Sequence, residues 1–124
     1  MHAPGLDIKQ EIARINNNVN IAMFGTGLRK QRITLADDKV VITADHKRIP
    51  ALAVLDQKER ILTRLIDAAI LDEYKRRLRA EITDQLGFTV VSVLKDYDPE
   101  REIAVTVIIL DEGCIKGTRC AKNI

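Results

Sequence analysis

Apolar residues recur at steps of three and four between residues 7 and 24, a spacing that places them on one face of a helix. Asp7 stands where an N-terminal cap is needed, and Gly25 stands where a helix would stop. The three asparagines at positions 16–18 have poor helix propensity. The pattern therefore predicts a helix over residues 7–24 that is weak or broken at the asparagines.

A second helical pattern runs from about residue 56 to residue 86, with an apolar residue at every fourth position. Asp56 and Glu59 match a capping box, and Gly87 follows the last apolar position. A step of four drifts by about 40° per repeat from a helix of 3.6 residues per turn. We therefore expect this helix to bend over a sheet or to break near residues 67–69.

Two further stretches alternate with period two, which is typical of hairpins. The segment RITLADDKVVITA has its turn at Asp37 and Asp38, and the segments FTVVSVL and IAVTVIIL form the second pair of strands. Both faces of the last strand are apolar, which favours a central strand or a strand at a subunit interface. In chain order the elements run α-β-β-α-β-β. This order predicts an α+β fold with one mainly antiparallel sheet packed by the long helix.

The length and composition indicate a single domain over residues 1–124, with 46% hydrophobic and 31% charged residues. We expect its core to span about residues 7–111 and residues 112–124 to form a polar tail. Cys114 and Cys120 lie in this tail, and their spacing matches neither a redox pair nor a usual zinc site. We interpret the tail as functionally neutral.

The net charge of +2 gives no general argument for a nucleic-acid or anionic-membrane partner. No run of 18 apolar residues is present, so we expect no membrane insertion, and the start of the chain lacks a secretory signal. Cytoplasmic residence is the default expectation.

The segment FGTGLRK places two glycines before two cations, and its backbone amides could hold an anion. The candidate anion or ligand loop consists of Gly25, Thr26, Gly27, Arg29 and Lys30. A phosphate loop ordinarily follows a strand, whereas this one follows a predicted helix. A helix C-cap followed by a plain loop is therefore the competing interpretation.

A cluster of cations on the long helix is a candidate surface for docking an acidic partner: Lys75, Arg76, Arg77 and Arg79. Glu73 stands four residues before Arg77 and can pair with it. The competing interpretation is an ordinary solvated helix face.

The segment KDYDPERE connects the last two strands and contains a candidate recognition turn of Asp96, Tyr97, Asp98 and Pro99. An Asp-Pro pair initiates turns, and two carboxylates at this spacing could alternatively hold a cation or perform acid–base chemistry. We interpret the segment as a turn. Ser92, the only serine, lacks the context of a hydrolase nucleophile. We therefore expect no enzymatic activity, no catalytic or metal site, and no cofactor.

Three segments, taken in order, resemble a small bacterial family named for the third component of the Na+-translocating membrane-potential-generating system (MpsC-like), formerly catalogued as a domain of unknown function. They are FGTGLRKQRITLADDKVVITA, then HKRIPALAVLD with DEYKRRLRAEITDQLGFTV, then VLKDYDPEREIAVTVIIL. Together they span roughly residues 10–111. The stretch HKRIPALAVLD departs from the commoner form, which suggests a divergent branch. The resemblance implies a cytoplasmic accessory protein, peripheral to the inner membrane and associated with inorganic-carbon or cation transport.

These observations favour a non-enzymatic accessory or interaction module that forms a homodimer or higher oligomer beside a membrane transporter subunit. One alternative is a small nucleic-acid-binding protein that uses Arg29, Lys30, Arg32 and residues 75–79. A further alternative is a small-ligand sensor or enzyme that uses the Gly-Thr-Gly loop together with Asp96 and Asp98.

Overall fold

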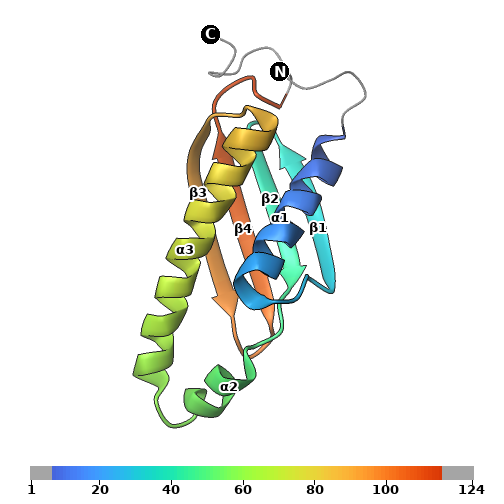
Figure 1. The fold of residues 1–124 in the computed structure, drawn as a ribbon. Helices are drawn as coiled ribbons and strands as arrows, with labels where there is room; N and C mark the ends of the chain where they lie inside the picture. The colour runs from blue at the N-terminus through green and yellow to red at the C-terminus, as the bar shows by residue number, and fades with distance from the viewer. Residues whose placement is uncertain (1–6, 116–124) are drawn as a thin grey trace.

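The structure, a computed structural model, describes residues 7–115. Its helices are α1 (Ile8–Phe24), α2 (Pro50–Asp56) and α3 (Arg60–Leu86), and its strands are β1 (Lys30–Ala36), β2 (Lys39–Asp45), β3 (Val90–Asp98) and β4 (Ile103–Leu110). The strands form one antiparallel sheet in the order β1-β2-β4-β3 (Figure 1). The predicted α+β class, with a long helix on an antiparallel sheet, is confirmed, and the last strand is central.

Helix α1 begins and ends where its capping residues predict. The Asp7 side chain accepts a hydrogen bond from the Gln10 amide at 3.2 Å, and Gly25 adopts the left-handed conformation with a φ of 77°. The predicted weakness at the asparagines is wrong, because α1 runs unbroken through them. Asn16 and Asn20 are buried and find hydrogen-bond partners inside the protein.

The predicted start of the long helix at Asp56 is wrong, because Asp56 belongs to a separate short helix and α3 begins at Arg60. Pro50 occupies the first turn of α2, where its missing amide costs nothing. Asp56 is the last residue of α2, and Glu59 makes no capping hydrogen bond to α3. The capping box therefore does not form. Helix α3 continues without a break across residues 67–69.

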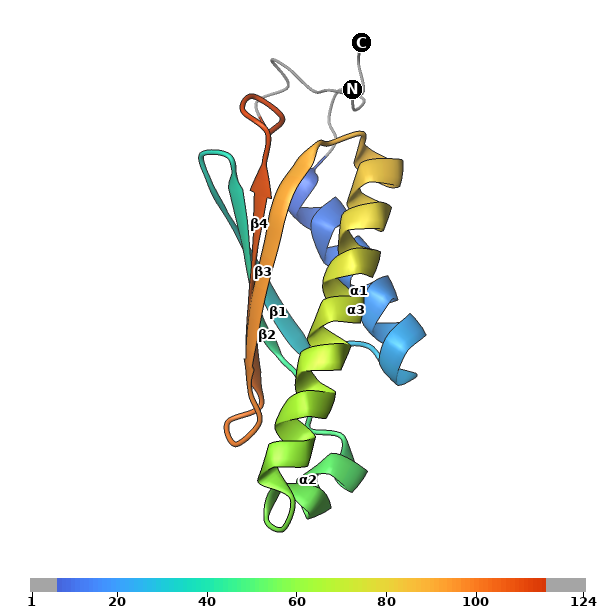
Figure 2. The ribbon, with the colours of Figure 1, turned by 90° about the vertical axis from the view of Figure 1, so that its left-hand side faces the viewer.

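Helices α1 and α3 cover one face of the sheet, and α2 lies beyond the end of the strands beside the start of α3 (Figure 2). The core fills the space between this face and the inner sides of α1 and α3, with a stripe at every fourth position of α3: Tyr74, Leu78, Ile82 and Leu86. The first half of α3 extends past the sheet toward α2, and its apolar side chains stay exposed, with Ile61 at 79% and Leu65 at 65%. Only the second half of α3 is therefore buried against the sheet.

The core reaches further along the chain than the sequence predicts. Cys114 is fully buried in the apolar cluster, and Ile115 packs against that cluster. The start of the predicted polar tail therefore belongs to the folded domain. Cys120 lies outside the described residues.

Candidate functional site

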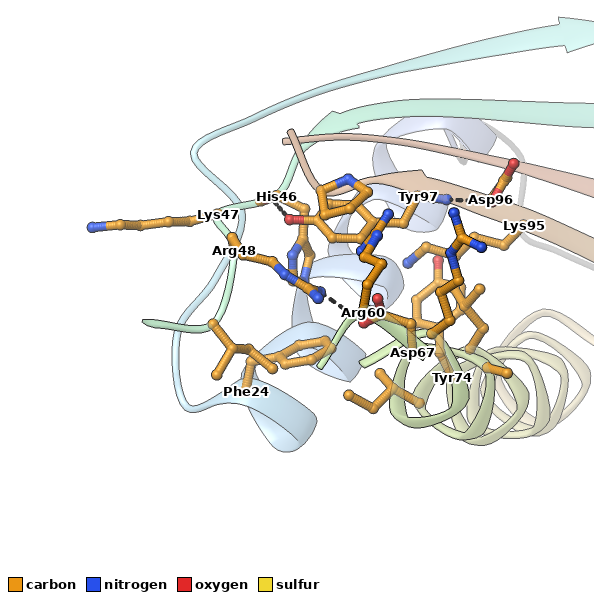
Figure 3. Close-up of a pocket in the computed structure, with 16 residues that line it drawn as sticks. Phe24, His46, Lys47, Arg48, Arg60, Asp67, Tyr74, Lys95, Asp96 and Tyr97 are labelled. Carbon is orange, nitrogen blue, oxygen red and sulfur yellow. Dashed lines mark hydrogen bonds and ion pairs between the residues drawn. The ribbon is translucent and has the colours of Figure 1, made fainter. Parts of the chain in front are cut away.

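A cavity of about 290 Å³ lies at the end of the sheet, beneath the first half of α3. Its walls come from residues 46–49 after β2, from α3, and from the end of β3 (Figure 3). The volume is at the lower end of the range that small-molecule pockets occupy. The cavity therefore has room for a small ligand.

Arg48 fixes the wall that residues 46–49 form. Its guanidinium is 6% exposed and donates to both carboxylate oxygens of Asp56, at 2.7 and 2.9 Å, and to Asp67 at 2.7 Å. Its backbone amide donates to the Glu102 carboxylate at 2.6 Å. One buried residue thus connects α2, α3 and the β3–β4 hairpin, and its hydrogen bonds hold the pKa of Asp56 down at about 2.

Lys95 brings an ammonium group into the cavity without a carboxylate to neutralise it. Its Nζ lies 3.4 Å from the centroid of the Tyr74 ring, a cation–π contact. Burial is the only cause that acts on its pKa, which it lowers to about 8. Among residues 7–115 this side chain forms no ion pair. The arrangement leaves a partly desolvated positive charge that a bound anion would stabilise.

The remaining walls are cationic and apolar. Arg64 lines the cavity and has no ion-pair partner in the described part of the chain, whereas Arg60 pairs with Asp56 at 3.4 Å. Lys47 points away from the cavity (Figure 3). The apolar part of the lining consists chiefly of Ile49, Ala68, Ile70, Leu71 and Pro99. Such a mixture suits a small anion with an apolar portion.

His46 closes one side of the cavity through ring contacts. Its imidazole makes edge-to-face contacts with Phe24 at 4.5 Å and with Tyr97 at 5.4 Å between centroids. The Tyr97 hydroxyl donates to the His46 carbonyl at 2.8 Å. Burial, followed by the charge of Lys95, lowers the pKa of His46. The imidazole is therefore neutral at pH 7 and does not add to the positive charge.

The structure places the predicted ligand loop next to this cavity rather than inside it. The Gly25 amide donates to the Ile21 carbonyl at 2.8 Å, and the Leu28 amide donates to the Asn17 side chain at 2.9 Å. A Cβ at Gly27 would lie 2.6 Å from Asn17 Oδ1, so a larger residue there would require the Asn17 side chain to move away from the Leu28 amide. Two of the amides that could hold an anion are thus already bonded.

A second cavity of about 240 Å³ does connect the ligand loop to the site. Thr26, Gly27 and Arg29 line it, and it shares residues 46–49 with the larger cavity. Lys30 lies in β1 instead.

The predicted recognition turn divides between the two faces of the sheet. Strand alternation places the side chain of Tyr97 on the helix-covered face and those of Asp96 and Asp98 on the opposite face. Both Tyr97 and Asp96 contribute to the lining of the cavity. Asp98 accepts hydrogen bonds from the amides of Glu100 and Arg101, which holds the turn. Pro99 contributes to the cavity wall.

The predicted docking cations on α3 are partly engaged by contacts within the chain. Arg76 and Arg77 both bind Glu73, at 2.6 and 2.7 Å, and Arg79 donates to the Val90 carbonyl at 2.6 Å. Lys75 lies half-buried on the same helix. These residues and Arg32 lie on opposite faces of the sheet, so they form no continuous basic patch of the kind that a nucleic-acid site requires.

Sequence reasoning missed both Arg48 and Lys95. Arg48 carries no local signal, because its partners Asp56 and Asp67 lie 8 and 19 residues away. Lys95 does carry one, since Val93, Lys95 and Tyr97 continue the alternation of β3 and so point toward the core.

The fold and this cavity together define a small α+β domain with a cationic pocket at the end of its sheet. The chain matches the family model described as the Na+-translocating membrane potential-generating system (MpsC) over residues 6–112, and it belongs to that family. No curated protein matches the chain, and no solved structure matches it. Within residues 7–115, each helix is too short or too polar to cross a membrane.

Proposed function

We propose that this chain is a non-enzymatic accessory module of a Na+-translocating membrane potential-generating system and that it works by binding a small carboxylate in the cavity beneath α3. The ammonium of Lys95 is the observation that carries the proposal, because it lies half-buried beside apolar walls and forms no ion pair with any residue from 7 to 115. Arg64 supplies a second cation for the same carboxylate. Family membership supports the association with the membrane system.

Replacing Lys95 with methionine is expected to weaken carboxylate binding at least tenfold, because the charge is lost while the apolar stem over Tyr74 remains. Isothermal titration calorimetry of the full chain with acetate, butanoate and benzoate measures the dissociation constants. The uncharged amides of the same acids should bind more weakly than the acids. Lys9→Met is the matched control, because Lys9 is exposed on α1 at the far end of the molecule.

The affinity of the protein for these carboxylates should fall as the pH rises above about 8, because Lys95 loses its proton in that range. The neighbouring titratable groups stay fixed in this range. Burial raises the pKa of Tyr74 and of Tyr97 to about 12, and the pKa of His46 lies below its usual value. Equal affinity of the Lys95→Met and wild-type proteins, or no binding of any of the three acids, would refute the carboxylate site.

The accessory role predicts that a transporter subunit with membrane-spanning segments co-purifies with the tagged protein at native abundance, at the cytoplasmic face of the membrane. Nuclease treatment before mass spectrometry distinguishes this outcome from nucleic-acid binding. Partners that remain after nuclease support the accessory role. Partners that disappear with nuclease would favour the nucleic-acid alternative instead.

A further inference from the structure

The face of the sheet opposite the helices is covered by no element of the described residues 7–115 (Figure 2), and it carries apolar side chains. Leu94 is 53% exposed, Ile103 is 40% exposed and Val105 is 39% exposed on this face. Val41 and Val107 are neighbours across β2 and β4 on the same side. Contiguous exposed apolar surface of this kind is characteristic of interaction sites.

The strand register places opposite charges at the two ends of one row across this face. Arg32 in β1 pairs with Thr43 in β2, Thr43 pairs with Val105 in β4, and Val105 pairs with Asp96 in β3. The adjacent row toward the β3–β4 turn also runs from a cation at β1 to a carboxylate at β3, with a second carboxylate at β2: Lys30, Asp45, Ile103 and Asp98. The face therefore has a cationic edge at β1, an apolar stretch along β4 and an acidic edge at β3, while β2 carries Lys39 and Asp45 at its two ends.

No ion pair among residues 7–115 neutralises the two charges that end the first row. Arg32 forms no ion pair among the described residues, and the Asp96 carboxylate accepts only the amide of the next residue, Tyr97, at 2.9 Å. On the helix layer, by contrast, charges are paired within the chain, since Glu73 binds both Arg76 and Arg77. Arg32 and Asp96 are thus both available to a partner.

We propose that two copies of this chain pack through these uncovered sheet faces about a twofold axis that runs parallel to the strands between β2 and β4. Such an axis lays β1 of one copy over β3 of the other, so each Arg32 meets the Asp96 of its partner copy, twice per dimer. The same axis lays β2 of one copy over β4 of the other, so Val107 of each copy packs against Val41 of its partner copy, and Val105 packs against Thr43. Sheets that pack face to face keep their strands within about 30° of each other, which this arrangement allows.

The distribution of charge selects this axis over the other twofold arrangement. An axis perpendicular to the strands would place β1 over β1 and β3 over β3. Arg32 would then face the cationic edge and Asp96 the acidic edge of the second copy. Juxtaposed like charges oppose association, whereas the parallel axis gives two charge pairs and closes the assembly at two copies.

Charge reversal tests the interface. Arg32→Asp and Asp96→Arg should each raise the dissociation constant of the dimer at least tenfold, and the double variant should recover most of the wild-type affinity. Sedimentation-velocity centrifugation of the full chain across a concentration series measures these constants, and circular dichroism confirms that each variant is folded. Arg76→Asp reverses a charge on the helix layer and should leave dimerisation unchanged.

A second variant probes the apolar part of the interface without relying on charge pairs. Val105→Lys should give a folded monomer, because it buries a lysine from each copy within the apolar part of the interface, beside the twofold axis. A wild-type protein that stays monomeric at high concentration would overturn the proposal. A dimer that tolerates all these changes would overturn it too, and would direct attention to the exposed apolar residues of α2 and α3.

Discussion

Replacing Arg48 with methionine is expected to lower the free energy of unfolding by about 3 kcal/mol, because two partly buried carboxylates lose their shared cation. Asp56 and Asp67 are only 21% and 20% exposed, so water compensates incompletely for the missing guanidinium. The amide of residue 48 keeps its bond to Glu102, so the loss reports the side chain alone. Urea denaturation followed by circular dichroism measures the difference.

Arg76→Met provides the matched control for this prediction. Arg76 also binds a carboxylate, that of Glu73 at 2.6 Å, but its side chain is 68% exposed. An exposed ion pair contributes roughly 0–1 kcal/mol, so this variant should stay close to the wild type. An equal decrease in the free energy of unfolding of the Arg48→Met and Arg76→Met proteins would contradict the stabilising role that the structure gives to Arg48.

The pH dependence of the two proteins should differ as well. The pKa of Asp56 is lowered from 3.8 to about 2 by Arg48, so this group stabilises the fold above pH 4 and loses that contribution as the pH falls toward 2. The Arg48→Met protein lacks the cause of the shift. Its stability should therefore decline less between pH 4 and pH 2 than that of the wild type.

The sequence predicts those parts of the fold that depend on neighbouring residues. The helix from Ile8 to Phe24 follows from its period and its caps, and the first hairpin follows from its alternation and its Asp-Asp turn. Asp37 adopts a positive φ of 57°, which aspartate tolerates better than most residues. Local patterns thus suffice for both elements.

The candidate site is harder to predict because it depends on contacts between distant segments. Asp56 resembles a helix cap by its position in the sequence. In the structure it is the last residue of the separate helix α2, and its carboxylate binds Arg48. Lys95 resembles a loop residue because it is charged, yet β3 continues through it to Asp98. In both cases a long-range electrostatic or packing contact outweighs the local pattern.

The asparagines at positions 16–18 show in the same way that local helix propensity can be outweighed by contacts with distant residues. They also lead to the second prediction of a large change in stability. Replacing Asn16 with alanine is expected to destabilise the protein by about 3 kcal/mol, although alanine is the better helix former. Asn16 is 2% exposed, accepts a hydrogen bond from the Tyr74 hydroxyl and donates to Gln31 at 3.1 Å. Without Asn16, the hydroxyl group of Tyr74 would be left with the contact of 3.4 Å to the Thr106 hydroxyl. Thermal and urea unfolding measure the loss.

Asn18→Ala is the control, because it makes the same substitution two positions away at an exposed site of the same helix. Helix propensity alone acts there, so the change should be neutral or stabilising by about 0.5 kcal/mol. If Asn16→Ala lowers the free energy of unfolding and Asn18→Ala raises it, then tertiary hydrogen bonding, and not helix propensity, determines which asparagine the fold requires. Two stabilising results would instead mean that the bonds of Asn16 to Tyr74 and Gln31 contribute no net stability.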